Sequence, residues 1–448
     1  MQIDSMDKYK EECGVVGIFS TKKINLHSYL YSSLITLQHR GQDSCGIAFS
    51  DKKSIECYKG VGLVNEVFSD DIPPNLSGYI GIGHVRYSTF GEVNTINAQP
   101  IFDNNFNCNL ALAHNGNITN IFSLKNELKK FNFNTTSDSE VILKLIEKYC
   151  KNSIDEALCS VIKTLEGGFS CVLLTKHELF AFRDPNGIRP LCIGKVKNDY
   201  IVCSESCVID ILGGEFIRDV LPGEIIKIDA SGITTINASS LCKCMTCSFE
   251  YIYFSRIDSV IDGVNVYETR FKSGINLYHE HPVDADVVIG VPESGNTAAL
   301  GFSKASSIPI TTGFVKNNFL GRSFIKSSQS KRCETVNLKL NVIKENVKNK
   351  NVVVVDDSII RGTTCKKIVS LLKDAGAKEI HYRVASPIVT SPCCLGINTS
   401  KSELIGSDMT LNEIANYIGV DTLGYISISG FLNILPKNKT VCLKCFYN

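Results

Sequence analysis

"NVVVVDDSIIRGTT", residues 351–364, joins a run of four valines to two adjacent carboxylates, an arginine, a glycine and two threonines. Four β-branched residues between polar ones predict a strand covered on both faces, as in the middle of a parallel sheet. Asp356 and Asp357 then lie at the carboxyl end of the strand. In open α/β sheets this end faces the ligand crevice, so the stretch predicts a binding site as well as a fold.

The next segment, "TTCKKIVSLLKDAGA", has the apolar spacing of an amphipathic helix. The free N–H groups of its first turn and the helix dipole favour a phosphate, which carboxylates would repel. We therefore expect an anion on the turn from Gly362 to Thr364, and hydroxyls or a divalent cation on the two aspartates. A phosphorylated sugar that carries magnesium satisfies both requirements.

The composition of the chain is that of a small-molecule enzyme. Its 448 residues predict two or three domains, and 47 Lys+Arg against 46 Asp+Glu argue against a nucleic-acid or membrane surface. The first residues, "MQIDSMDKYKEEC", lack the apolar core of a secretory signal, and no apolar stretch reaches transmembrane length. We expect a cytoplasmic protein whose 19 scattered cysteines are mostly core residues or free thiols.

The pattern of apolar residues divides the chain into two parts. Up to about residue 240, short apolar runs separated by Gly and Asn turns predict large antiparallel sheets. Two helical patterns interrupt them, "LHSYLYSSLITLQHRG" and "SDSEVILKLIEKYC"; the second has Ser137, Asp138 or Ser139 as its N-cap. From about residue 265, strand–turn–helix units predict a parallel sheet. The boundary falls near "NASSLCKCMTC".

Five motifs of the first part put polar residues at strand ends or turns: "EECGVVGIF", "LQHRGQDSCGIA", "HVRYSTFG", "LAHNGNI" and "TSDSEVI". Together they resemble the N-terminal-nucleophile glutaminase domain of glutamine amidotransferases. The resemblance implies that Cys13 is the nucleophile and that residues 1–12 are removed. The freed α-amino group is then the base that takes up the thiol proton.

The same resemblance assigns the other glutamine contacts. Arg86 binds the α-carboxylate of glutamine with its planar fork, and Asp138 binds the α-ammonium. Asn115 and Gly116 supply the side-chain amide and backbone N–H of an oxyanion hole. Read without the family, Asn115-Gly116 is the strongest hairpin-turn dipeptide of the chain.

The opening stretch resembles the diphosphate-sugar motif of type I phosphoribosyltransferases. A second predicted strand, "DVVIGVPESG", brings Ser294 and Gly295 to a place where a backbone can approach a pyrophosphate. The basic segment from Gly313 to Asn341 is a candidate flap, with Lys316, Arg322 and Arg332 able to reach phosphates. The predicted phosphoribosyl-diphosphate site comprises Asp356, Asp357, Ser358, Arg361, Gly362, Thr363, Thr364 and Lys316, with Ser294, Asp356 and Asp357 on Mg²⁺.

From Cys13 to Cys445 the chain resembles the glutamine phosphoribosylpyrophosphate amidotransferases. This implies a propeptide at 1–12, an α+β N-terminal-nucleophile domain of layered antiparallel sheets at 13–240, and an α/β type I phosphoribosyltransferase domain at 241–448. The implied reaction opens purine synthesis: ammonia released from glutamine attacks C1 of 5-phosphoribosyl 1-diphosphate, giving phosphoribosylamine, glutamate and pyrophosphate. A homotetramer inhibited by purine nucleotides is also implied.

The sequence departs from the family pattern at four positions. Asn318 and Phe319 stand where the flap usually has arginine and tyrosine, Glu293 replaces an aspartate, and Ile257 replaces a proline. The chain also ends three residues after Cys445. These departures concern flap closure and fine geometry more than the reaction class.

Two other functions are compatible with parts of the chain. A glutaminase coupled to another acceptor would keep the first half, and a regulator that senses phosphoribosyl diphosphate would keep the second. The set of Cys13, Arg86, Asn115 and Asp138 argues against a sensor, which needs no glutaminase.

The cysteines near the boundary and the end of the chain are compatible with two alternative kinds of metal centre. Spacing alone gives Cys244-x-x-Cys247 and Cys442-x-x-Cys445, a pair of units that suggests zinc, although nearly two hundred residues separate them. Resemblance instead matches Cys247, Cys393, Cys442 and Cys445 to the ligands of a [4Fe–4S] cluster in the branch with a cleaved propeptide. We predict the iron–sulfur cluster in a structural role, with Cys244 and Cys394 as bystanders.

Overall fold

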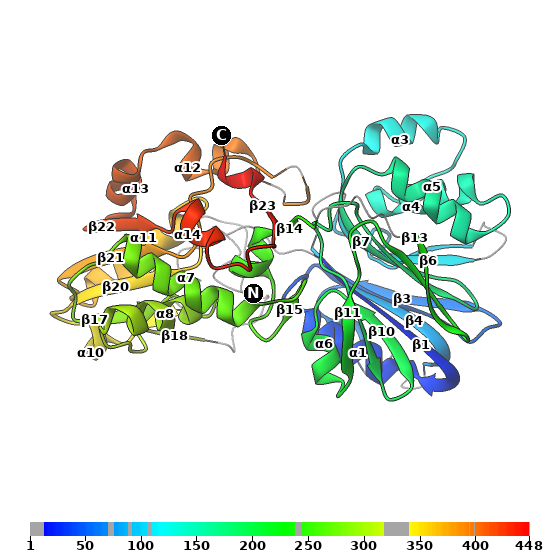
Figure 1. The fold of residues 1–448 in the computed structure, drawn as a ribbon, viewed down its shortest axis with the longest axis horizontal. Coiled ribbons are helices and arrows are strands. Elements are labelled where there is room, and N and C mark those ends of the chain that lie inside the picture. The colour runs from blue at the N-terminus through cyan, green and yellow to red at the C-terminus, as the bar shows by residue number, and fades with distance from the viewer. Residues whose placement is uncertain are drawn as a thin grey trace.

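The computed structural model describes residues 13–69, 76–87, 92–104, 109–237, 244–317, 340–393, 395–397 and 399–447. The chain forms two parts that lie side by side (Figure 1). Antiparallel sheets make up the N-terminal part, and a parallel sheet makes up the core of the C-terminal part. The predicted change from antiparallel sheets to a parallel sheet along the sequence is therefore confirmed. No helix in these ranges is long and apolar enough to cross a membrane.

Two antiparallel sheets pack face to face in the N-terminal part. The first has the strand order β11 (Glu215–Asp219), β9 (Cys192–Val196), β10 (Asp199–Cys203), β1 (Gly14–Asn25), β4 (Ser77–Arg86), β2 (Ser44–Ser50) and β3 (Ile55–Val61). The second has the order β13 (Gly232–Asn237), β12 (Ile225–Asp229), β8 (Leu179–Arg183), β7 (Gly167–Leu174), β6 (Leu110–Ile118) and β5 (Ile101–Asp103).

Helices cover the outer faces of both sheets (Figure 1). They are α1 (Leu26–Leu37), α2 (Val64–Val67) and α6 (Cys207–Ile211) on the first sheet, and α3 (Ile121–Glu127), α4 (Asp138–Tyr149) and α5 (Ile154–Thr164) on the second. Three apolar clusters separate the resulting four layers, one between the sheets and one under each helical layer. Side chains alternate along each strand, so the central strands contribute to two of these clusters.

Both helices predicted for this part form. α1 begins after Asn25, whose side chain accepts from the His27 N–H, and α4 begins after Ser137, whose side chain accepts from the Ser139 N–H. Ser137 is thus the N-cap among the three predicted candidates. The first turn of α4 contains Asp138, so local capping chemistry fixes the position of a predicted site residue.

The C-terminal part is built on four parallel strands in the order β17 (Val287–Gly290), β20 (Asn351–Asp356), β21 (Glu379–Val384) and β22 (Thr422–Tyr425). All four valines of β20 are completely buried, which confirms the strand covered on both faces. One face packs against α7 (Val266–Glu280) and α8 (Asn296–Ser306), and the other against α11 (Thr363–Asp374) and α13 (Leu411–Ile418).

Shorter elements complete the C-terminal part. They are the pairs β14 (Thr246–Cys247) with β23 (Val441–Cys442), β15 (Val260–Ile261) with β16 (Val264–Asn265) and β18 (Phe314–Lys316) with β19 (Leu340–Val342), and the helices η2 (Glu250–Phe254), α10 (Lys344–Val347), η4 (Lys401–Glu403), α12 (Ile405–Asp408), α14 (Ile428–Leu432) and η5 (Lys444–Phe446).

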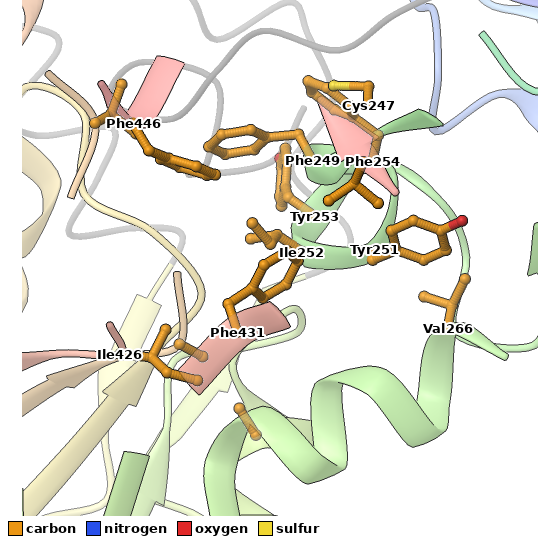
Figure 2. Close-up of a cluster of buried hydrophobic side chains, with 14 of the residues drawn as sticks. Cys247, Phe249, Tyr251, Ile252, Tyr253, Phe254, Val266, Ile426, Phe431 and Phe446 are labelled. Carbon is orange, nitrogen blue, oxygen red and sulfur yellow. The ribbon is translucent and has the colours of Figure 1, made fainter. Parts of the chain in front are cut away.

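The segment that joins the two parts packs several aromatic side chains into the core. Figure 2 shows the η2 side chains Tyr251, Ile252, Tyr253 and Phe254 beside Phe249, with side chains of α7, α14 and η5 around them. The rings of Phe249 and Phe446 lie 5.8 Å apart between centroids. The last residues of the chain therefore pack against the joint.

Candidate functional site

Cys13 lies directly before β1 and next to the end of β4. Gly14 pairs with Val85 in the antiparallel ladder, so Cys13 lies beside Arg86. The Cys13 thiol is 7% exposed and contacts the Tyr87 carbonyl oxygen at 3.5 Å. The Arg86 side chain is buried, and its Nη1 donates to the Glu92 carbonyl at 3.1 Å. Cys13 and Arg86 are thus neighbours at the same end of the first sheet.

A contact between the two sheets brings Asn115 to the same end. His84 Nε2 lies 2.9 Å from the His114 carbonyl oxygen, which joins the end of β4 to β6. Burial lowers the pKa of His84 to about 3, so its ring is neutral at pH 7. The Asn115 side chain is completely buried, and neither its oxygen nor its nitrogen has a hydrogen-bond partner among the described residues.

Gly116 has a backbone conformation that suits glycine. Its φ is +137°, and a Cβ there would lie 2.1 Å from the Gly168 carbonyl oxygen. The Asn115-Gly116 pair lies inside β6, opposite β7, and does not form a hairpin turn. The hairpin interpretation was therefore wrong, because these residues pair with Ser170 and Phe169 in the middle of a sheet.

Asp138 approaches the same place from the start of α4. Its Oδ2 accepts from the Ile118 N–H at 3.2 Å, two residues after Gly116. Asn97 connects it to Arg86: the Asn97 amide donates to the Glu92 carbonyl at 2.9 Å and to Thr136 Oγ1 at 2.8 Å. All five predicted glutaminase residues thus converge on one end of the two facing sheets.

The two aspartates that end β20 have different surroundings. Asp356 accepts from the Tyr382 hydroxyl at 2.7 Å and from the Asp357 N–H at 2.8 Å. Asp357 accepts from the Ser358 hydroxyl at 2.6 Å and lies within the electrostatic reach of the buried Arg270. Asp356 therefore anchors the strand end to β21, while Asp357 points to a different set of groups.

The turn after the strand has the predicted form. Gly362 is the N-cap of α11 with a φ of +77°, and Thr363 and Thr364 open the helix. Arg361 forms an ion pair with Glu403 of η4. The first turn of α11 lies at the carboxyl end of the sheet, where the positive end of its helix dipole favours an anion.

A neighbouring strand end contributes a second turn. After β17, the Val291 N–H donates to the Val355 carbonyl at 2.9 Å, which fixes the turn with Ser294 and Gly295 against β20. Lys316 Nζ lies 3.6 Å from a carboxylate oxygen of Glu293. Glu293, which replaces the family's aspartate, thus reaches the base of the predicted flap; Asn318, Phe319, Arg322 and Arg332 lie outside the described residues.

A cavity of about 600 Å³ opens beside this turn. Its walls include Glu293, Ser294 and Arg270 of the C-terminal part, and Thr36 and His39 at the end of α1. It lies at the joint between the two parts and is bounded by the segment from Tyr253 to Asp258.

The cysteines predicted as ligands lie near one another. Cys247 pairs with Cys442 in the short parallel ladder, and burial together with Cys393 and Cys442 raises the pKa of Cys445. Cys244 lies in another environment, with Lys439 Nζ 3.3 Å from its sulfur. In the part of the chain that the structure describes, no group of three or more His, Cys, Asp or Glu side chains is arranged to hold a metal ion. Cys394 is outside that part.

The sequence alone did not identify several residues of the candidate sites. Tyr382 and Arg270 surround the aspartates, Thr136 and Asn97 bridge the glutaminase residues, and Arg40 contacts the backbone of Cys13. Arg40 was part of a quoted motif, "LQHRGQDS", but its partners are distant in sequence. Nothing local identifies them.

Two family models match the chain. Residues 84–210 match a glutamine amidotransferase domain, and residues 273–386 match a phosphoribosyl transferase domain. The amidophosphoribosyltransferase of Methanocaldococcus jannaschii is 44% identical, over 97% of this chain and 96% of its own length. The amidophosphoribosyltransferase of Bacillus subtilis is 41% identical, over 97% of this chain and 93% of its own.

A solved structure agrees with these relatives over nearly the whole chain. Glutamine phosphoribosylpyrophosphate amidotransferase from B. subtilis, complexed with ADP and GMP, superposes with a TM-score of 0.90 at 40% identity, covering 97% of this chain and 96% of that one. Together with the glutaminase-like sheets, the phosphate turns and the two family matches, this similarity shows that the chain belongs to the amidophosphoribosyltransferase family.

Proposed function

We propose that Cys13 is the nucleophile with which this amidophosphoribosyltransferase hydrolyses glutamine, after residues 1–12 have been removed. The observation that carries the proposal is the convergence of Cys13, Arg86, Asn115 and Asp138 at one end of two facing sheets. In the mature chain the α-amino group of Cys13 is the base, and its ordinary pKa of about 8 suits proton uptake at neutral pH.

The chemistry follows from the side chains. The Cys13 thiolate attacks the side-chain carbonyl of glutamine, the C–N bond breaks, and water then cleaves the thioester to glutamate. Arg86 and Asp138 bind the α-carboxylate and α-ammonium through charge complementarity. The Asn115 amide and the Gly116 N–H stabilise the oxyanion by hydrogen bonds. The buried Asn115 amide has no hydrogen-bond partner within the described chain, and the oxyanion would supply one.

The second site uses the released ammonia. Ammonia attacks C1 of phosphoribosyl diphosphate, and the bond from C1 to the diphosphate oxygen breaks. The turn from Ser358 to Thr364 with Arg361 binds the 5-phosphate, and Ser294, Gly295 and Lys316 bind the diphosphate. Asp357 holds ribose hydroxyls, while Asp356 mainly fixes the strand end. The oxygen ligands of Ser294, Asp356 and Asp357 suit Mg²⁺, which would ease departure of the diphosphate.

Domain limits and regulation extend this proposal. We assign the glutaminase domain to 13–240 and the phosphoribosyltransferase domain to 241–448, which agrees with the break between β13 and β14. Purine nucleotides are proposed as inhibitors, since a relative was solved with ADP and GMP. A homotetramer is proposed from the family alone.

The test separates the two half-reactions. Cys13→Ala should abolish glutamine-dependent synthesis and retain synthesis from ammonia, because the second site does not use the thiol. Asp357→Asn should impair both syntheses and retain basal glutaminase. N-terminal sequencing of the active protein should return Cys13. Active protein that begins at Met1, or equal loss of all activities in both variants, would contradict the proposal.

We also propose that Cys247, Cys393, Cys442 and Cys445 hold a [4Fe–4S] cluster. Each thiolate of such a cluster binds a different iron, so the four sulfurs lie farther apart than around one zinc ion. The pairing of Cys247 with Cys442 and the proximity of Cys393 and Cys442 to Cys445 support a shared site for the four thiolates. The cluster would tie the last residues of the chain to the joint.

Anaerobic purification tests the cluster directly. The protein should be brown, with iron and labile sulfide in stoichiometric amounts. Cys393→Ser should lose the cluster, whereas Cys244→Ser, whose sulfur faces Lys439, should keep it. Colourless protein with bound zinc, or the reverse behaviour of the two variants, would overturn the assignment.

A further inference from the structure

Arg40 joins the backbone of Cys13 to the C-terminal part of the chain. Its Nε donates to the Cys13 carbonyl oxygen at 3.1 Å, and its Nη2 donates to Glu250 Oε1 at 2.7 Å. Nη1 donates to Glu205 Oε1 at 2.6 Å and to Glu250 Oε2 at 3.0 Å. One guanidinium therefore binds the residue proposed as nucleophile and, 210 positions away in sequence, the first residue of η2.

The contacts lie in a buried and charged environment. Arg40 is 1% exposed, and Glu205 and Glu250 are not exposed at all. Burial raises the pKa of both carboxyl groups, but His39 and Arg40 outweigh it at Glu205, and Arg40 outweighs it at Glu250, so both pKa values fall below their ordinary range. Separating buried charges is costly, so a displacement of Glu250 would also displace Arg40.

The far end of η2 connects to the phosphoribosyl site. Arg270 of α7 donates to the carbonyl oxygens of Tyr251 at 2.9 Å and Ser255 at 2.7 Å. Burial lowers the pKa of Arg270 to about 10, and the charge of Asp357 acts in the opposite direction. Arg270 also lines the cavity beside Ser294, together with the residues that follow η2. A ligand in this cavity therefore contacts the segment that Glu250 begins.

We propose that Arg40 is a positioning residue that makes the orientation of Cys13 depend on the occupancy of the phosphoribosyl-diphosphate site, through Glu250 and η2. The inference rests on the proposed function and adds a route between its two sites. A ligand that favours one position of η2 selects the position of Arg40, and with it the orientation of the Cys13 carbonyl and thiol. Thermodynamic linkage then requires glutamine binding to favour the same state.

The experiment measures glutaminase kcat/KM with and without phosphoribosyl diphosphate, and the alkylation rate of Cys13 by iodoacetamide under both conditions. For each quantity we take the ratio of the value with phosphoribosyl diphosphate to the value without it. In the wild type we expect this ratio to be about 5 to 150, the usual range of coupling between two sites. Glu250→Gln keeps the size of the side chain but weakens its hold on Arg40, so both ratios should fall to about one. Ser255→Ala, which removes a hydroxyl donor to Glu250, should lower them partly.

Asp262→Asn is the matched control. Asp262 forms a second buried pair across the same joint, with Arg183 Nη1 and Nη2 at 2.7 and 2.8 Å, and that arginine does not contact Cys13. This variant should keep the wild-type ratios even if its melting temperature falls as much as that of Glu250→Gln.

The outcomes separate the inference from the function on which it rests. Wild-type protein that makes no phosphoribosylamine from ammonia or glutamine refutes the proposed function. If the wild type is active and stimulated, full stimulation in Glu250→Gln and Ser255→Ala overturns the route through Arg40. Equal loss of stimulation in Asp262→Asn would overturn it too, since any weakening of the joint would then suffice.

Discussion

Asn115 is a residue at which a substitution should affect the stability of the protein and its activity in different ways. Both polar atoms of its side chain are buried without a partner in the described chain. An unsatisfied buried polar group costs about 1–3 kcal/mol, so an apolar side chain of similar size should not destabilise the fold. The buried amide is thus available for the oxyanion role proposed above.

We predict that Asn115→Leu lowers glutaminase kcat by about 10²–10³-fold, the usual effect of removing one oxyanion donor. The melting temperature should stay the same or rise, and synthesis from ammonia should persist. Steady-state kinetics with each nitrogen donor and thermal unfolding measure these effects. Unchanged glutaminase activity would show that Asn115 does not contact the oxyanion.

At the scale of elements, the contact between α7 and α8 holds the turn with Ser294 and Gly295, for which we propose diphosphate binding. A Cβ on Gly274 of α7 would lie 1.8 Å from the Ala298 carbonyl oxygen, and one on Gly301 of α8 would lie 1.9 Å from that of Phe271. The two helices are thus in backbone contact at a pair of glycines. α8 begins directly after Ser294 and Gly295, so its position sets the position of that turn.

Gly301→Ala should force the helices apart and tilt the start of α8. We expect a loss of about 1–3 kcal/mol in stability, as for other overpacked sites, and a higher KM for phosphoribosyl diphosphate. Leu300→Ala, at a neighbouring position that is 41% exposed, is the control and should change both quantities little. Thermal unfolding and ammonia-dependent kinetics test this, and an unaltered KM in Gly301→Ala would contradict it.

At the scale of the whole molecule, two buried arginines hold the parts together. Arg40 meets Glu250, and Arg183 meets Asp262, which also lies 3.5 Å from Lys439 Nζ. Burial raises the pKa of Asp262, but the charge and hydrogen bonds of Arg183 outweigh this and bring it below its ordinary range. Such a carboxylate stabilises the fold above its unfolded pKa of about 3.9, and the contribution disappears as the pH falls toward the folded value.

Acid should therefore weaken the joint. The melting temperature of the wild type should fall as the pH decreases from about 5 to 3, where Glu205, Glu250 and Asp262 begin to bind protons on unfolding. Asp262→Asn should lower the free energy of unfolding by about 3–5 kcal/mol at pH 7, because it leaves Arg183 buried without its partner charge. The melting temperature of this variant should also fall less than that of the wild type when the pH decreases. An equal fall in melting temperature in both proteins would show that Asp262 is not a source of the pH dependence.

The sequence by itself determined the features that depend on nearby residues. The buried strand β20, its turn and α11 follow from a valine run, a glycine and helical spacing, and the Ser137 cap of α4 follows from local hydrogen bonding. The motifs around Cys13 and Arg86 also indicated the strand ends for which we propose glutaminase chemistry. These features are readable because backbone geometry and side-chain periodicity act within a few residues.

Only the tertiary structure decided which distant groups meet. The sequence did not distinguish the anchoring Asp356 from Asp357, because the difference lies in Tyr382, on the next strand. It did not show Arg40 between Cys13 and Glu250, or Asn115 inside a sheet and not at a turn. These arrangements arise from the packing of two sheets and of two parts of the chain, and a partner 210 positions away leaves no local pattern.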